Sequence, residues 1–315
     1  MISNSSLISE ATKARVHAIM EEMGYHPNMI ARSLVSKITR IVGTLIPGNS
    51  DKAFQHPFFP EILRGITTQA DLSGYNILLS NSGSPERETE VVDDLIGGGV
   101  VEGMILMSSR QKDAAVEHLK AANMPFVLVG RPDDSAAQGV HWVDNDNVRA
   151  GYELARYFIQ KGHRQIAFIG VTPEMMVILD RLRGYRRALE ENGIPFDERL
   201  VVPGSYMVAD GYAMTEKLLH SGQKFTGLIA SDDFQAYASI HCLMEHGLHI
   251  PQDVAVAGFN NVTLSEYNLP SLTSVEVNAY NLGKTAFELL FAQFKHKAGP
   301  MSVFVPTHIV QRVSC

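Results

Sequence analysis

Short apolar segments alternate with amphipathic helical segments along most of this chain, and this alternation limits its fold more than any other feature. Alternating β and α units imply parallel sheets joined by right-handed crossovers. The strand candidates are too many for one compact sheet, so we expect two doubly wound parallel-sheet lobes in an α/β fold. The strand candidates are residues 41–46, 76–79, 104–107, 126–129, 166–169, 228–230 and 254–258, and the helical candidates include 61–72, 86–96, 150–160, 212–219 and 282–294.

The composition fits a globular protein of the cytoplasm. The 315 residues are 45% apolar and 19% charged, which is typical of a chain with packed cores. No apolar stretch approaches the roughly 20 residues that a membrane span needs, and the first residues lack the basic and apolar regions of a signal peptide. The two cysteines, Cys242 and Cys315, lie far apart. This usage fits a reducing compartment without structural disulfides, so we expect a cytoplasmic location.

The first 40 residues differ from the rest of the chain. They carry a net charge of +2, against −9 for the remainder. Ser9 and Thr12 are suited to cap a helix, Gly24 is suited to end it, and apolar residues recur at helical spacing between them. A single helix of about a dozen residues is too short to bury a core by itself. A modestly basic head on an acidic body suits a DNA-contacting element with a sensor behind it.

No motif in the body indicates catalysis. The glycine-rich segment 97–103 precedes a strand candidate, whereas a phosphate-binding loop must follow a strand and open a helix. His241 and Glu245 would share one face of a helix, but His246 would point elsewhere, and a polar helix end explains them and His249 better than a metal site. No P-loop, nucleophile elbow or zinc-protease motif occurs. We therefore expect a protein that is not an enzyme and that needs no cofactor and no metal.

Polar residues at the ends of strand candidates indicate a binding site instead. Open α/β sheets bind ligands at the carboxyl ends of their strands. Asp144 ends the strand that holds His141 to Val143, and Asp232 follows the strand 228–230. The alternative for Asp144 is a plain cap for the next helix.

Several strings resemble the lactose-repressor (LacI) family of bacterial transcription regulators. They are Gly24-Tyr-His-Pro-Asn28 with Ala31-Arg-Ser-Leu34, Asp180-Arg-Leu-Arg-Gly-Tyr185, and Gly258-Phe-Asn-Asn261 followed by Pro270-Ser-Leu-Thr273. The resemblance implies an effector-binding core of two periplasmic-binding-protein-like lobes, one of residues 41–143 with 275–304 and one of residues 144–274 with 305–315. Residues 1–40 would be the remnant of a helix-turn-helix head plus a hinge helix. The chain begins where the family's recognition helix should have ended, so we expect either a truncated head or a protein that has lost base reading.

The resemblance also implies an effector site between the lobes. Arg181 would be its central polar ligand, with Asp180 beside it; the alternative for Arg181 is a solvated helix face. Phe58 and Phe59 would form an aromatic wall of the site, and the alternative for both rings is core packing. Acid, amide, arginine and aromatic groups together suit a neutral polyhydroxylated ligand. Within the family the strings 142–146, 231–234 and 258–261 look most like Gram-positive maltose-operon repressors, which makes maltose or a related glucoside the expected effector. The candidate effector-binding residues are Phe58, Phe59, Arg131, Asp144, Asp180, Arg181, Tyr206, Asp232 and Asn260.

The hinge string implies contacts with operator DNA through Ala31, Arg32, Leu34 and Lys37. Leu34 matches the family's wedge, which inserts into the minor groove, while the basic residues would contact phosphates. Each subunit supplies one wedge, so we expect a homodimer on a near-palindromic site. A sugar bound between the lobes would shift their orientation and change operator affinity, with relief of repression as the expected sign. The alternative is a sugar-binding receptor of the same fold without DNA binding, against which the hinge string and the missing signal peptide argue.

Overall fold

A computed structural model of the chain describes residues 9–24, 38–46, 54–108, 110–135, 137–204, 210–296 and 301–315. The chain forms two units, Met1–Arg40 and Ile41–Cys315. In the first unit, helix α1 (Glu10–Glu22) begins after Ser9, whose side chain accepts a hydrogen bond from the backbone N–H of Thr12 at 3.3 Å. The helix predicted here is thereby confirmed. The predicted DNA contacts, Ala31, Arg32, Leu34 and Lys37, lie outside the described residues.

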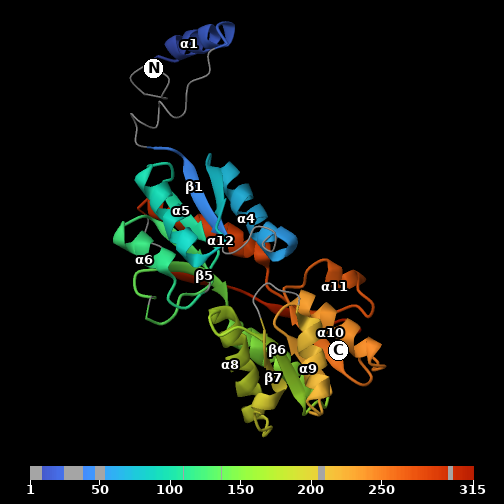
Figure 1. The fold of residues 1–315 in the computed structure, drawn as a ribbon. Helices are drawn as coiled ribbons and strands as arrows, with labels where there is room; N and C mark the ends of the chain where they lie inside the picture. Colours follow the sequence, from blue (N-terminus) through green and yellow to red (C-terminus); the bar gives the residue numbers. More distant parts are fainter. Residues whose placement is uncertain are drawn as a thin grey trace. The chain divides into compact units, whose positions relative to one another are not determined.

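Two sheets organise the described part of residues 41–315 (Figure 1). The first has the order β11-β5-β4-β3-β1-β2 and the second the order β12-β10-β9-β8-β6-β7. All neighbouring strands are parallel except β10 and β12, which pair antiparallel. The predicted fold of two parallel-sheet lobes is confirmed. The strands are β1 (Ile41–Ile46), β2 (Asn76–Asn81), β3 (Gly103–Leu106), β4 (Phe126–Val129), β5 (His141–Asn145), β6 (Ile166–Val171), β7 (Val201–Pro203), β8 (Gly227–Ala230), β9 (Ala255–Phe259), β10 (Thr273–Glu276), β11 (Ser302–Val305) and β12 (His308–Val310).

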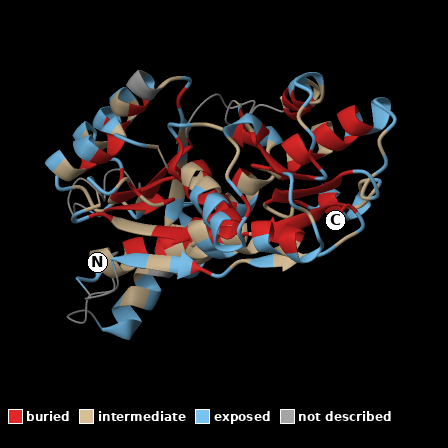
Figure 2. Ribbon diagram, turned by 90° about the horizontal axis from the view of Figure 1, so that it is seen from below, coloured by how far each residue is buried: buried red, intermediate tan, exposed pale blue. Residues whose placement is uncertain are grey.

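Helices cover both faces of each sheet, so the central strands are buried, whereas edge strands such as β2 and β11 are partly exposed (Figure 2). Successive residues of a strand point to opposite faces. In β3, Ile105 packs on the side of α4 (Phe58–Leu72) and α12 (Ala279–Phe294), and Leu106 packs on the side of α5 (Pro85–Gly97) and α6 (Ala114–Ala121). The second sheet lies in the same way between α7 (Asn147–Gln160) with α8 (Met176–Glu191) and α9 (Gly211–His220) with α10 (Asp233–Glu245). The short elements η1 (Glu198–Leu200) and α11 (Leu264–Tyr267) complete this lobe.

Three connections cross between the sheets: β5 to α7, β10 to α12, and β11 to β12. Asn145 joins them, because its side-chain amide donates to the carbonyl oxygens of Val277 at 3.0 Å and Val305 at 2.9 Å. One side chain therefore links all three crossovers by hydrogen bonds. In the described part of the chain, no helix has both the length and the apolar character to cross a membrane.

Candidate effector-binding site

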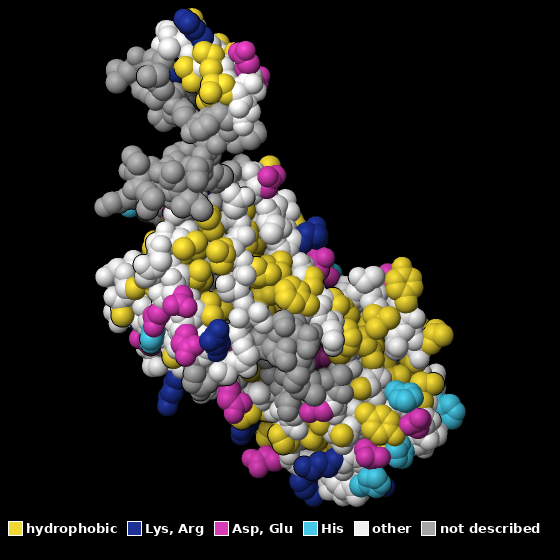
Figure 3. Space-filling view, turned by 45° about the horizontal axis from the view of Figure 1, so that its top comes forward, with side chains coloured by type: hydrophobic (Ala, Val, Ile, Leu, Met, Phe, Trp, Pro, Cys, Tyr) yellow, Lys and Arg dark blue, Asp and Glu magenta, His cyan; other side chains and the backbone are white. Residues whose placement is uncertain are grey.

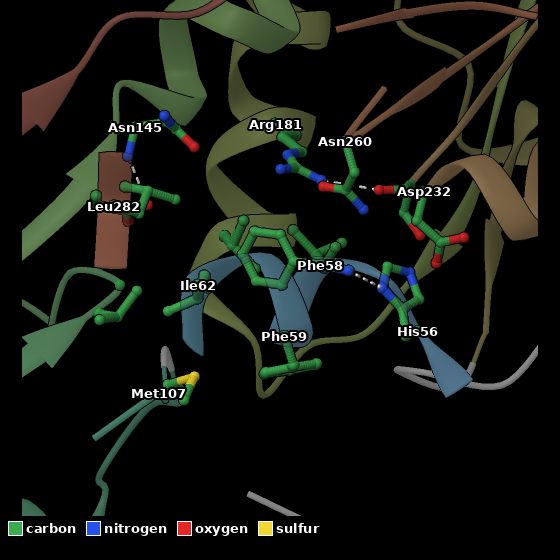
Figure 4. A pocket seen from close by; sticks show the side chains of 16 residues that line it. His56, Phe58, Phe59, Ile62, Met107, Asn145, Arg181, Asp232, Asn260 and Leu282 are labelled. Atoms are coloured by element: carbon green, nitrogen blue, oxygen red, sulfur yellow. Dashed lines mark hydrogen bonds between the residues drawn. The ribbon is translucent and has the colours of Figure 1, made fainter. Parts of the chain in front are cut away.

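A cavity lies between the two lobes, where the carboxyl ends of strands from both sheets face each other (Figure 4). Its empty volume, counted with its opening to solvent, is about 740 Å³. Such a position is where open α/β sheets bind small molecules. The cavity is lined by His56, Phe58, Phe59, Ile62, Met107, Val129, Gly130, Asp144, Asn145, Val177, Ile178, Arg181, Ser231, Asp232, Asn260 and Leu282.

The structure brings six of the nine candidate residues to this cavity. They come from α4, the end of β5, α8 and the loops after β8 and β9, and they are Phe58, Phe59, Asp144, Arg181, Asp232 and Asn260. Arg131 and Asp180 do not line the cavity but pair with each other nearby. Tyr206 lies outside the described residues.

Arg181 is buried and held at the wall of the cavity by two hydrogen bonds and a cation–π contact. Its Nε donates to Oδ1 of Asn147 at 3.0 Å, and its Nη1 donates to the carbonyl oxygen of Ser231 at 2.8 Å. Its guanidinium lies 4.1 Å from the centre of the Phe259 ring, a cation–π contact. The planar guanidinium is thereby fixed in orientation before any ligand arrives, which suits a site that must recognise the geometry of hydroxyl groups.

Asp144 is a buried carboxylate that three donors orient. Its Oδ2 accepts from the backbone N–H of Arg131 at 2.9 Å, and its Oδ1 accepts from the N–H of Asn145 at 2.7 Å and from the amide of Asn147 at 3.0 Å. Burial nevertheless raises the pKa of Asp144 to about 6. The group is therefore more than a plain helix cap: the cap of α7 is Asp146, whose side chain accepts from the N–H of Arg149.

Asp232 and Asn260 face the cavity from the second lobe. Asp232 caps α10, since its Oδ1 accepts from the N–H of Gln235 at 2.9 Å. Burial raises the pKa of Asp232, and the charges of His56 and Arg181 oppose that rise. Asn260 has a φ of 99°, a left-handed conformation that only Gly adopts readily. The backbone of the turn after β9 is therefore strained at the residue whose side chain faces the cavity.

The aromatic pair and a histidine form the opposite wall, at the start of α4. The rings of Phe58 and Phe59 lie 5.3 Å apart, edge to face. His56 accepts a hydrogen bond at Nδ1 from the N–H of Phe58 at 3.3 Å, and its ring centre lies 5.2 Å from that of Phe234 in the second lobe. Burial lowers the pKa of His56, and the negative charge of Asp232 opposes that fall.

Sequence reasoning missed His56, Asn145 and most of the apolar lining. His56 lies two residues before the predicted aromatic pair, and this proximity is the sequence signal that could have revealed it. Asn145 directly follows the predicted Asp144, and this proximity could have revealed it as well. Apolar residues such as Met107 and Leu282 have no such signal, because nothing distinguishes a residue that lines a cavity from one that fills a core.

Two histidines of the second lobe that the sequence offered as metal ligands or helix-end residues pair with acidic side chains. Figure 3 shows histidine side chains gathered at one edge of the molecular surface. His241 pairs with Glu245 at 3.4 Å, and His249 pairs with Asp253 at 2.9 Å. Within the described residues, no group of three or more His, Cys, Asp and Glu side chains could hold a metal ion.

Comparison with known proteins identifies the family. The family described as "Bacterial regulatory proteins, lacI family" matches residues 1–28, and the "Periplasmic binding protein-like domain" matches residues 155–315. The transcriptional regulator MalR of Streptococcus pneumoniae is 33% identical over 291 residues, 92% of this chain and 86% of MalR. The regulator CelR of Thermobifida fusca is 31% identical over 315 residues, 100% of this chain and 92% of CelR.

A solved structure shows the same architecture. The complex of the transcriptional regulator CelR with cellobiose has a TM-score of 0.84 and 30% sequence identity, and the match covers 100% of this chain and 94% of that chain. The family consists of transcription regulators rather than enzymes, which confirms the expectation that this chain is not an enzyme. With relatives more than 30% identical over most of their length, this chain belongs to the lacI family of bacterial regulatory proteins.

Proposed function

We propose that this chain is a sugar-responsive transcriptional repressor whose effector is a maltose-like disaccharide. The observation that carries the proposal is the cavity between the lobes, where one oriented guanidinium, two carboxylates and an amide meet an aromatic wall. Donors and acceptors of this kind bind sugar hydroxyls, while the faces of Phe58 and Phe59 suit the C–H faces of a pyranose ring.

The charges of the cavity favour a neutral ligand. Asp144 and Asp232 stand against Arg181, so a phosphate or a free carboxylate would meet acidic groups on two sides. The similarity to MalR and to the CelR–cellobiose complex supports a disaccharide of glucose, and maltose and cellobiose are the first two to test.

We also propose that the protein acts as a homodimer on operator DNA. The match of residues 1–28 to the lacI family supports DNA binding by the N-terminal unit. By the family resemblance, Ala31, Arg32, Leu34 and Lys37 contact the operator, with Leu34 as the wedge in the minor groove. Analytical ultracentrifugation should then give twice the chain mass of 34.7 kDa, and a monomer at micromolar concentration would contradict the dimer.

A thermal-shift panel tests the effector. The sugars are maltose, cellobiose, trehalose, sucrose, glucose and glucose 6-phosphate. A ligand at 100 times its Kd should add about 2.7 kcal/mol of stability. A selective shift with one disaccharide supports the proposal, whereas no shift with any of these sugars would overturn the sugar assignment.

Two arginines on α8 provide the matched pair of variants for the panel. Arg181→Lys keeps the positive charge but loses the planar fork, and should reduce the shift strongly. Arg183→Lys changes an exposed side chain on the same helix and should leave the shift unchanged. The competing function, a sugar receptor without DNA binding, predicts the same shifts but equal affinity for operator and random DNA.

A further inference from the structure

Among the described residues, two polar contacts cross the cleft between the lobes, in addition to the ring contact of His56 with Phe234. In the first, Arg131, two residues after the end of β4, forms a bidentate ion pair with Asp180 on α8. Its Nη2 lies 2.8 Å from Oδ1, and its Nε contacts Oδ2. In the second, the N–H of Gln111 donates to the carbonyl oxygen of Glu174 at 2.9 Å, next to an antiparallel bridge between Arg110 and Met175. Both contacts span the cleft from the first lobe to the second.

The ion pair is buried and bidentate. The Arg131 side chain is 17% exposed and the Asp180 side chain 2% exposed. A two-pronged arginine–carboxylate contact fixes orientation as well as distance. Breaking it would leave a buried carboxylate with a poorer partner, since the remaining contact of Asp180 is with Arg183, which is 58% exposed.

The second contact is anchored within the first lobe. Arg110 donates to Oε1 of Glu88 at 2.5 Å, and the Glu88 side chain is 4% exposed. The segment of Arg110 and Gln111 that reaches Glu174 is therefore held to the first lobe by this ion pair. If the lobes move apart, the hydrogen bond from Gln111 must break together with the Arg131–Asp180 pair.

Arg131 also connects the ion pair to the cavity. The backbone N–H of Arg131 donates to Oδ2 of Asp144, and Asp144 lines the cavity. The side chains of Arg131 and Asp180 do not line the cavity. The same residue thus orients a proposed effector ligand through its backbone and holds the lobes together through its side chain.

We propose that Arg131 and Asp180 are a clasp that holds the lobes closed around the effector, and that they set effector affinity by positioning rather than by contact. The effect on affinity rests on the proposed effector site, whereas the closing of the lobes does not. The clasp stabilises the closed lobes in the free protein. The apparent Kd is inversely proportional to the fraction of molecules that are closed and able to bind. If loss of the clasp lowers that fraction about tenfold, the Kd for the effector rises about tenfold.

Hydrogen exchange on the free 315-residue protein tests the clasp without any ligand. The amide of Gln111 reports on closure directly, because its acceptor lies in the other lobe. In Arg131→Gln, a peptide containing Gln111 should exchange about tenfold faster, while peptides from the buried strand β8 should exchange as in the wild type. Arg183→Gln removes the other partner of Asp180 within one lobe and should leave the Gln111 peptide unchanged. Unchanged exchange in Arg131→Gln, or equal acceleration in both variants, would overturn the proposal.

A double-mutant cycle on maltose and cellobiose affinity then separates positioning from contact. Arg131→Gln and Asp180→Asn should each raise the Kd about tenfold, and the double variant should be no worse than either single variant, because both remove one interaction. Arg131→Lys, which keeps the charge but not the fork, should fall between wild type and Arg131→Gln. Additive losses, or a loss of affinity without faster Gln111 exchange, would identify Arg131 as a direct ligand and overturn the clasp. If neither sugar binds the wild type, the effector proposal fails and the exchange result alone decides the clasp.

Discussion

Two adjacent carboxyl groups at the start of α10 have separate tasks. Asp232 faces the cavity and caps the helix, whereas Asp233 is fully buried and accepts from the N–H of Val262 and from the hydroxyls of Ser265 and Ser274, at 2.6 to 2.9 Å. Asp233→Ala should cost about 3 kcal/mol of unfolding free energy or more, because it leaves three buried donors without their acceptor. Denaturant unfolding measures this loss.

Asp232→Ser should behave in the opposite way. Serine also caps helices, so we expect a stability change of less than about 0.5 kcal/mol. Effector affinity should nevertheless fall at least about tenfold, because the hydroxyl is a weaker acceptor than a carboxylate. Calorimetric titration with the disaccharide selected by the thermal-shift panel measures the affinity. Unchanged affinity would remove Asp232 from the effector site.

Asp144 should make effector binding depend on pH. Its pKa is raised to about 6, so the carboxyl is ionised at pH 7.5 and largely protonated at pH 5. If the ionised form accepts a sugar hydroxyl, the Kd should be constant above about pH 7 and should rise as the pH falls through 6, by up to tenfold per unit. Asp144→Asn should lose the part of this dependence centred near pH 6. The raised pKa of Asp232 acts in the same direction, so the difference between the two profiles, and not the wild-type profile alone, is the test.

At the scale of elements, two glycines set the distance between α7 and α8 and thereby the position of Arg181. A Cβ on Gly184 would lie 1.9 Å from the carbonyl oxygen of Val148, and one on Gly151 would lie 2.1 Å from that of Arg181. Gly184→Ala should therefore destabilise the protein by about 3 kcal/mol, although alanine favours helices. It should also weaken effector binding, because α8 carries Arg181.

Gly97 at the end of α5 is the matched control. A Cβ there would meet nothing within 4 Å, so Gly97→Ala should be neutral or stabilising by up to about 1 kcal/mol. Thermal unfolding of the two variants gives the comparison. Equal behaviour would show that the lobe tolerates a wider spacing of α7 and α8 than its packing indicates.

Elements with a strong local signal were predictable, and those that depend on distant partners were not. The apolar β-branched run at 41–46 predicted β1 with its observed ends, and 126–129 predicted β4 in the same way. The edge strand β7 has three residues, too few to show a pattern. The antiparallel pairing of β12 with β10 was hidden because pairing direction depends on the path of the chain between lobes, which short apolar segments do not encode.

The candidate site was predicted to a similar extent. Asp144 was predicted from its place at the end of a strand, and motif resemblance predicted Arg181, which lies on α8 beside the cavity. Motif resemblance also assigned Arg131 and Asp180 as effector ligands, and that assignment stays a prediction. The structure shows these two side chains in an ion pair with each other. No local pattern announces that pair, because its members lie 49 residues apart in the sequence.

At the scale of the whole molecule, the effector and the operator must influence each other equally. If a sugar lowers operator affinity by some factor, the operator must lower sugar affinity by the same factor, because the two bindings share one thermodynamic cycle. Coupling of this kind commonly amounts to 1–3 kcal/mol, or about 5- to 150-fold. We therefore expect the Kd for the disaccharide to rise within this range when the full-length protein is saturated with a DNA duplex that it selected from a random library. A random duplex of equal length and salt concentration is the control, since non-specific binding depends mainly on phosphate contacts. A Kd that the selected duplex leaves unchanged would mean that the cavity does not regulate DNA binding, and would favour the sugar receptor over the repressor.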